Sequence, residues 1–138
     1  MKYKIAVGIL AILILFACAA PIVAHHAVTA EFDGHTLIPL TGTLTKVSWI
    51  NPHIFFYVDV KNKNNKVDSW TIESGPTVAL HRQGAKRNMF VEGDVIDVQV
   101  NPAKDGTKYL GFLRHVKFKD GTEIAFANTD DPPISNPK

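Results

Sequence analysis

Apolar and polar residues alternate along most of the chain from residue 38 to residue 126, which is the pattern of half-buried β-strands. The clearest strand is 54–60, where apolar side chains at even-numbered positions alternate with Phe55, Tyr57 and Asp59. Further strands are expected at 38–49, 67–73, 96–100 and 110–118, with a short one at 124–126. We therefore expect a mainly β domain.

Two of these strands carry details that matter for packing. In 38–49 the apolar positions change from even to odd numbers before Val47 and Trp49, and a β-bulge near Thr45-Lys46 accounts for that change. The last long strand is expected to turn one face to the core. That face holds Leu110, Phe112, Val116 and Phe118, while Leu113, His115 and Lys117 lie on the other.

A short helix is expected between the third and fourth strands. Ser74-Gly75-Pro76 has the character of a helix start, and Gly84 that of a helix end. Three strands, a short helix, two strands and a terminal hairpin are typical of a small antiparallel OB-like β-barrel, whose closure removes exposed strand edges. An open β-sandwich is the alternative fold.

The first 24 residues have the three parts of a secretory signal peptide. A positive start with Lys2 and Lys4 precedes an uncharged apolar run, and small residues follow up to Ala24. An uncleaved anchor helix is the alternative. We expect a signal peptide at 1–24, an N-terminal segment at 25–37, the barrel domain at 38–127 and a flexible tail at 128–138.

Two cleavage sites compete in this segment. A cut after Ala24 makes His25 the first residue of a periplasmic or secreted protein. Leu15-Phe16-Ala17-Cys18 resembles a lipobox, and that cut would attach the protein to a membrane through a lipidated Cys18. Phe16 is bulky for a lipobox, so the cut after Ala24 is favoured.

Removal of the signal changes the charge balance. Loss of Lys2 and Lys4 takes the 15 basic residues to 13, against 13 acidic ones, so the mature chain is formally neutral. No basic surface is implied, which argues against nucleic acid as a partner. The mature chain has no cysteine after this cut, and so no disulfide.

Several motifs together resemble those of a known family. They are His25-His26 at the mature start, Glu31-Phe32-Asp33, Trp49-Ile50-Asn51-Pro52-His53 and Gly93-Asp94. In these motifs the chain resembles a family of small secreted bacterial proteins that is catalogued only as a domain of unknown function. The resemblance covers nearly all of residues 25–126. The resemblance implies a periplasmic β-barrel and brings no activity. It has one departure, Ala27, where the family usually has serine.

Histidine is the residue type that points to chemistry. If His25 is the new N-terminus, its α-amine and ring Nδ1 can chelate one metal ion, and His26 or His53 can supply a second imidazole. Three nitrogen ligands of this kind suit Cu(II) or a similar transition metal. Glu31 or Asp33 would orient one of these ligands by accepting a hydrogen bond from it. The competing interpretation is structural, with the first two histidines as polar spacers and His53 holding its turn.

A second functional hypothesis needs no metal. Trp49, Phe55 and Tyr57 would form an aromatic face that binds a small ligand or a periplasmic protein partner, unless the segment containing Phe32 covers Phe55 and Tyr57. Catalysis is not expected, because the sequence has none of the common nucleophile, phosphate-loop or metalloprotease motifs. An acid–base pair is not indicated either. The carboxylates of Glu31, Asp33 and Glu73 could lie near His53, but their spacing in the sequence does not predict such a pair.

Overall fold

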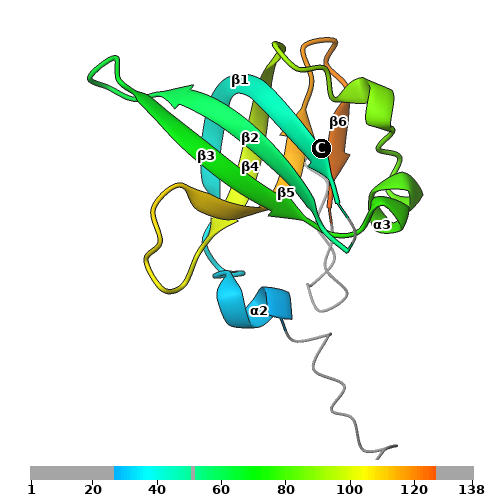
Figure 1. The fold of residues 1–138 in the computed structure, drawn as a ribbon, viewed down its shortest axis with the longest axis horizontal. Coiled ribbons are helices and arrows are strands. Elements are labelled where there is room, and N and C mark those ends of the chain that lie inside the picture. The colour runs from blue at the N-terminus through cyan, green and yellow to red at the C-terminus, as the bar shows by residue number, and fades with distance from the viewer. Residues whose placement is uncertain (1–26, 51, 127–138) are drawn as a thin grey trace, which may run out of the picture.

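The computed structural model describes residues 27–50 and 52–126 (Figure 1). The elements are α2 (Ala27–Glu31), β1 (Ile38–Trp49), β2 (Ile54–Lys61), β3 (Val67–Ser74), α3 (Thr77–Arg82), a 3-10 turn (Arg87–Met89), β4 (Val95–Pro102), β5 (Leu110–Lys117) and β6 (Glu123–Ala125). The predicted signal peptide, both cleavage sites and the tail 128–138 lie outside these residues. No helix in the described ranges has the length and apolar character needed to cross a membrane.

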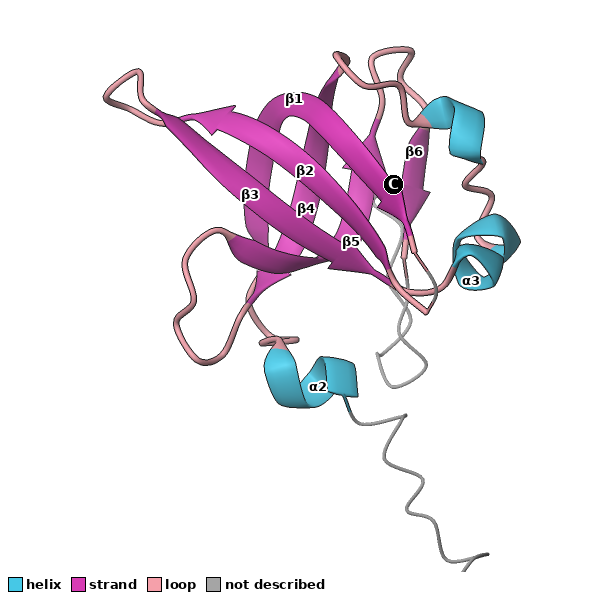
Figure 2. Cartoon of the chain, viewed as in Figure 1, coloured by secondary structure: helices cyan, strands magenta, loops and turns pink. Residues whose placement is uncertain are grey.

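The strands form one sheet that closes into a barrel. Their order is β3-β2-β1-β4-β5-β6, and an additional parallel pairing of β3 with β5 joins the two ends of the five-stranded part. All other pairings are antiparallel. Figure 2 shows the strands wrapped around a common interior, with α3 outside. The predicted OB-like barrel with a short helix between the third and fourth strands is therefore confirmed, and an open sandwich is not what the chain forms.

The barrel interior is built from alternate residues of the strands. On β2 the side chains of Ile54, Phe56 and Val58 are buried, as the alternation predicted. At one end of the barrel the core is aromatic. Phe90 packs against Phe56 with ring centroids 4.7 Å apart and against Phe118 at 5.2 Å.

The predicted bulge in β1 is confirmed. The pairing with β2 shifts between Leu44 and Lys46, so that Thr45 is the extra residue. The shift lets Leu44 point into the core from one side of the bulge and Val47 and Trp49 from the other. A residue inserted into one strand reverses the alternation that follows it, which is why the apolar positions change parity here.

The prediction for β5 is partly wrong. Leu113 is only 1% exposed and belongs to the core, whereas Phe112 lies outside the main core and packs against Phe32 with ring centroids 5.5 Å apart. The reason is a second register shift, because Val100 pairs with Leu113 while the preceding Gln99 pairs with His115. Arg114 is the extra residue between them. The apolar residues around it do not change from even to odd positions, so the sequence did not indicate this bulge.

The segment before the barrel is attached to the loop after β4. Phe32 forms an isolated bridge with Ala103, and the backbone N–H of Asp33 donates to the Pro102 carbonyl at 2.9 Å. Lys104 adds two bonds: its Nζ donates to the carbonyl of Thr29 at 2.6 Å, and its backbone N–H to that of Glu31 at 2.8 Å. These contacts hold α2 against one end of the barrel.

Gly42 on β1 lies where a side chain does not fit. A Cβ at this position would lie 2.6 Å from the Asp59 carbonyl oxygen and 2.7 Å from Val58 Cγ1. We expect Gly42→Ala to lower the free energy of unfolding by about 1–3 kcal/mol, because the β1–β2 pairing must move to admit the methyl group. Urea denaturation measures this. Gly34→Ala is the control, since nothing lies within 4 Å of its Cβ position; equal losses in both variants would contradict the close approach.

Candidate functional site

His53 and Glu73 form a hydrogen-bonded pair on the outer face of the barrel. His53 precedes β2 and Glu73 lies near the end of β3, and Phe55 pairs with Glu73 across the two strands. His53, two residues before Phe55, is therefore the diagonal neighbour of Glu73 on the same face. Its Nδ1 contacts the Oε1 carboxylate oxygen of Glu73.

The two side chains of the pair are buried to different degrees. The Glu73 side chain is 11% exposed and that of His53 is 34% exposed. An ionised carboxylate can only accept hydrogen bonds, so the Nδ1–H group of the ring donates a hydrogen bond to Glu73. In the neutral ring the lone pair is then on Nε2, the nitrogen on the opposite side. A carboxylate behind Nδ1 is the usual support of a metal-binding histidine.

Aromatic side chains flank Glu73 on both neighbouring strands. Phe55 of β2 is its register partner on one side and Phe112 of β5 on the other. Phe32, which is 2% exposed, packs against Phe112 and so links the segment before the barrel to this face. The apolar flanks keep water from the carboxylate, which strengthens its interaction with the His53 ring.

The other two predicted metal ligands lie outside the described residues. His25 and His26 immediately precede α2, whose first residue is Ala27. Within residues 27–50 and 52–126 no group of three or more His, Cys, Asp or Glu side chains is arranged to hold a metal ion. The predicted ligands His25 and His26 are outside that range, so the predicted metal site stays a prediction.

Asp33 and Glu31, the predicted supporting carboxylates, are near the start of the barrel. Asp33 accepts hydrogen bonds from the His35 backbone N–H at 3.0 Å and the Thr36 hydroxyl at 2.7 Å. The Thr36 hydrogen bond, followed by that of His35, lowers the pKa of the Asp33 carboxyl below its ordinary value. Glu31 ends α2 and its side chain is exposed. Whether either one supports His25 or His26 stays a prediction.

The remaining described histidines lie on separate elements. His35 is exposed in the turn before β1, and His81 is exposed on α3. His115 on β5 has its own carboxylate partner, with Nε2 3.3 Å from Glu123 Oε2. None of these contacts joins them to His53. His81 and Glu123 are for that reason suitable positions for control variants.

The structure does not bring Trp49, Phe55 and Tyr57 onto one face. Trp49 pairs with the inward-facing Ile54 and packs edge-on against Phe56 and Phe90, with centroids 6.4 Å and 6.0 Å away. The guanidinium carbon of Arg87 lies 4.7 Å from the Trp49 ring centre. Trp49 thus closes one end of the core.

Phe55 and Tyr57 lie on the outer face of β2 and are half-buried. Lys46 Nζ lies 5.6 Å from the Tyr57 ring centre, a cation–π arrangement that covers part of that ring. Phe32 packs against Phe112 on β5. An aromatic site on this face would therefore consist of Phe55 and Tyr57 beside the His53–Glu73 pair.

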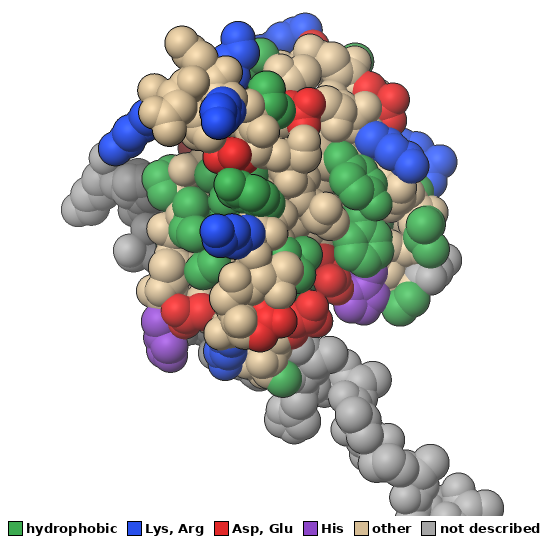
Figure 3. Space-filling view, turned by 60° about the vertical axis from the view of Figure 1, so that its left-hand side comes forward, with side chains coloured by type: hydrophobic (Ala, Val, Ile, Leu, Met, Phe, Trp, Pro, Cys, Tyr) green, Lys and Arg blue, Asp and Glu red, His purple; other side chains and the backbone are tan. Residues whose placement is uncertain are grey.

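One face of the molecule carries charges of both signs. The face drawn in Figure 3 shows Lys and Arg side chains next to Asp and Glu side chains and hydrophobic ones, with no extended region of one sign. Among the described residues, Lys117 Nζ lies 2.8 Å from a Glu123 carboxylate oxygen and Lys119 Nζ lies 2.7 Å from an Asp94 carboxylate oxygen.

Two solved structures are similar in fold to part of this chain. One is the mitochondrial single-stranded DNA binding protein Rim1 of S. cerevisiae, with 6% sequence identity and a TM-score of 0.46 over 61% of this chain and 93% of that one. The other is a ZRD-deleted mutant of TiaS in complex with agmatine, with 20% identity and a TM-score of 0.43 over 62% of this chain and 22% of that one. At these values neither similarity indicates a function.

No curated protein matches the chain. A family model does match, over residues 12–111, and its description is "Family of unknown function (DUF6152)". The matched range includes the His25-His26 start, the Trp49–His53 turn and the Gly93-Asp94 pair, on which the resemblance was based. The chain therefore belongs to the DUF6152 family.

Proposed function

We propose that the mature chain is an exported, non-enzymatic protein that binds Cu(II) or a similar transition metal ion. Its ligands are the α-amine and Nδ1 of His25 together with Nε2 of His53 or the imidazole of His26. The observation that carries the proposal is the contact between His53 Nδ1 and the buried carboxylate of Glu73, because Nε2 is then the ring nitrogen that can accept a metal ion.

The attachment of α2 supports the participation of the N-terminal residues. Phe32 is held against Phe112, which is the register partner of Glu73, and Glu73 contacts His53. The helix α2 begins at Ala27, five positions before Phe32, and rises about 1.5 Å per residue, so its first residue is about 8 Å along the axis from the Phe32 anchor. His25 and His26 directly precede this helix in the sequence, and the proposal requires them to meet the His53 ring.

The export step supports the same chemistry. A signal peptide cut after Ala24 exposes the amine of His25, and only a free amine can form a chelate with the ring of its own residue. A tetragonal set of nitrogen ligands favours Cu(II), whereas Zn(II) prefers tetrahedral sites. The balanced charge of the mature chain gives no support to a nucleic acid partner.

The proposal is tested on the protein purified from the periplasm. Its intact mass should correspond to a chain beginning at His25. Competitive titration should show one equivalent of Cu(II) bound, with affinity lowered at least about 100-fold in His25→Ala, since two of its nitrogen ligands belong to or depend on that residue. His81→Ala is the control and should bind as the wild type does. A mass that begins at Cys18, or equal affinities in all three proteins, would contradict the proposal.

A second candidate is supported by the outer aromatic pair. Phe55 and Tyr57 keep part of their surface accessible on β2, and OB barrels commonly bind their ligands on the face of the second and third strands. If this candidate is right, the substitution Phe55→Ser should abolish the binding of the protein partner or small apolar ligand. Binding of Cu(II) separates the candidates, because the aromatic face alone offers the metal no nitrogen ligand.

A further inference from the structure

The first half of β3 forms an open edge of the barrel. β2 pairs with β3 over its whole length, Val67–Ser74, but β5 pairs with it only from Thr71 to Glu73. Within the described part of the chain, no strand pairs with the other side of residues 67–70. The hairpin of β2 and β3 extends beyond the other strands, with its tip at the upper left of Figure 1. An open strand edge of this kind is where a further strand can be added.

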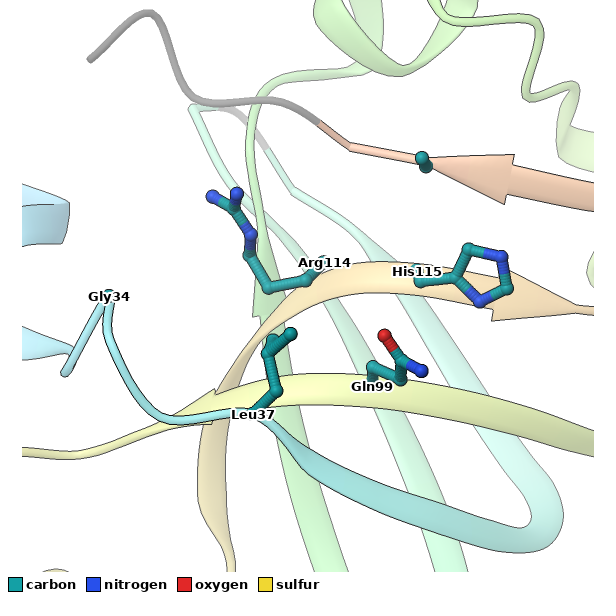
Figure 4. A pocket seen from close by; sticks show the side chains of 6 residues that line it. Gly34, Leu37, Gln99, Arg114 and His115 are labelled. Carbon is teal, nitrogen blue, oxygen red and sulfur yellow. The ribbon is translucent and has the colours of Figure 1, made fainter. Parts of the chain in front are cut away.

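The other end of the sheet is covered. β6 pairs with β5 along His115–Lys117. Figure 4 shows this region, where β6 runs beside β5 and the turn with Gly34 and Leu37 lies next to a small pocket of about 130 Å³. The described residues therefore cover the outer edge of β5 and leave that of β3 open between residues 67 and 70.

The backbone groups that face the open edge belong to Val67 and Ser69. The backbone N–H of Thr71 donates to the Tyr109 carbonyl at 2.8 Å, on the side of β3 away from β2. In a strand the backbone groups of successive residues point to opposite sides, so those of Ser69 and Val67 point to the same side as those of Thr71. Two N–H and two C=O groups are thus available to a further strand, and the Val67 side chain beside them is 54% exposed.

The charged side chains at this edge are complementary to those of a second copy. Lys66 and Asp68 have opposite charges and lie two positions apart, on the same face of the hairpin. Lys66 is exposed. Asp68 accepts hydrogen bonds from Asn62 Nδ2 at 3.2 Å and 3.3 Å, and an ionised carboxylate can accept further ones. An edge with charges of one sign repels a copy of itself, whereas an edge with both signs can attract one.

One antiparallel register satisfies both the backbone and the charges. With Val67 opposite Val67 of the second copy, these two residues exchange two backbone hydrogen bonds, and Lys66 of each chain lies opposite Asp68 of the other. With Val67 opposite Ser69, the two Asp68 side chains would face each other, which is unfavourable. The next register would need the backbone N–H of Thr71, which is already bonded to Tyr109.

We propose that a second copy of this chain pairs with the open edge of β3 in the Val67–Val67 register, so that the sheet continues from one chain to the other. The contact is symmetric and closed, as is usual for homodimers. Because it is small, the dimer forms only at high protein concentration. Glu73 lies at the opposite end of the β2–β3 ladder, so the proposal does not depend on the metal site.

The test is sedimentation equilibrium of the mature chain between about 10 μM and about 1 mM, the range in which small interfaces associate. The average mass should rise with concentration towards that of two chains. Lys66→Glu and Asp68→Lys each place like charges opposite each other, and each should raise the dissociation constant at least about tenfold. An equimolar mixture of these two variants should associate as well as the wild type, because every opposing pair in the mixed dimer again has opposite charges.

A proline substitution covers the case in which Asp68→Lys does not fold. Val67→Pro removes an N–H that points to the open edge and takes no part in the ladder with β2, so it should abolish association. Val67→Ala, which keeps this N–H, is the control and should still associate. A wild-type chain that stays monomeric at the highest concentration would overturn the proposal, also if slow exchange of the Val67 and Ser69 amides showed that the chain's own residues cover the edge. So would a dimer that Lys66→Glu and Val67→Pro leave unchanged.

Discussion

Replacing Phe56 by alanine is expected to lower the free energy of unfolding by about 3–5 kcal/mol, because it removes a fully buried aromatic ring and leaves a cavity. Phe56 is 2% exposed, and its ring lies 4.7 Å from that of Phe90 and 6.4 Å from that of Trp49. Since small domains are stable by only about 5–15 kcal/mol in total, the variant should be partly unfolded at moderate temperature. Urea denaturation followed by tryptophan fluorescence measures the loss.

Phe55→Ala is the matched control for this prediction. The same side chain is removed from the adjacent position, but Phe55 lies on the outer face and is only half-buried. Its loss should therefore cost well under half as much as that of Phe56. Equal losses in the two variants would mean that the inward and outward faces of β2 have been assigned wrongly.

Glu73→Gln is expected to weaken Cu(II) binding about 10–100-fold, the usual effect of removing the carboxylate behind a metal-binding histidine. The amide has nearly the same shape, so the packing between Phe55 and Phe112 is kept, but it lacks the charge that holds Nδ1–H and directs Nε2. Competition with a chelator of known affinity measures the change on the mature protein.

Glu123→Gln provides the control for this experiment. Glu123 also contacts a histidine, His115, yet that pair lies on β5 and β6, and the proposed metal site does not use it. Its substitution should leave the Cu(II) affinity within error of the wild type. If both glutamine variants, or neither, lose affinity, the contact between Glu73 and His53 has no special part in metal binding.

The barrel could be predicted from the sequence because its signals are local. Alternation identifies β2, whose inner residues from Ile54 to Val58 are buried in the structure as expected. The bulge in β1 could also be predicted, because the apolar positions change from even to odd numbers at Thr45. An inserted residue causes such a change, and it can be recognised when apolar residues lie on both sides of it. Turn residues such as Asp105-Gly106 then divide the chain into strands.

The interactions of the site could not be predicted in the same way. His53 and Glu73 are separated by 20 positions in the sequence, and only the register of β2 with β3 makes them diagonal neighbours. The bulge at Arg114 could not be predicted because Phe112 and Leu113 are both apolar. The sequence therefore did not show whether the even-numbered or the odd-numbered side chains of β5 face the core. Trp49 was grouped with Phe55 and Tyr57 by proximity in sequence, whereas the strand pairing places it on the inner side.

The participation of His53 is tested most directly by the electron paramagnetic resonance spectrum of the mature protein with one equivalent of Cu(II). We predict nitrogen couplings from the amine and imidazole of the first residue and from a further imidazole, and we predict that His53→Ala removes or replaces the last of these. An identical spectrum and unchanged affinity in His53→Ala would contradict the account, because the imidazole held by Glu73 would then have no contact with the metal.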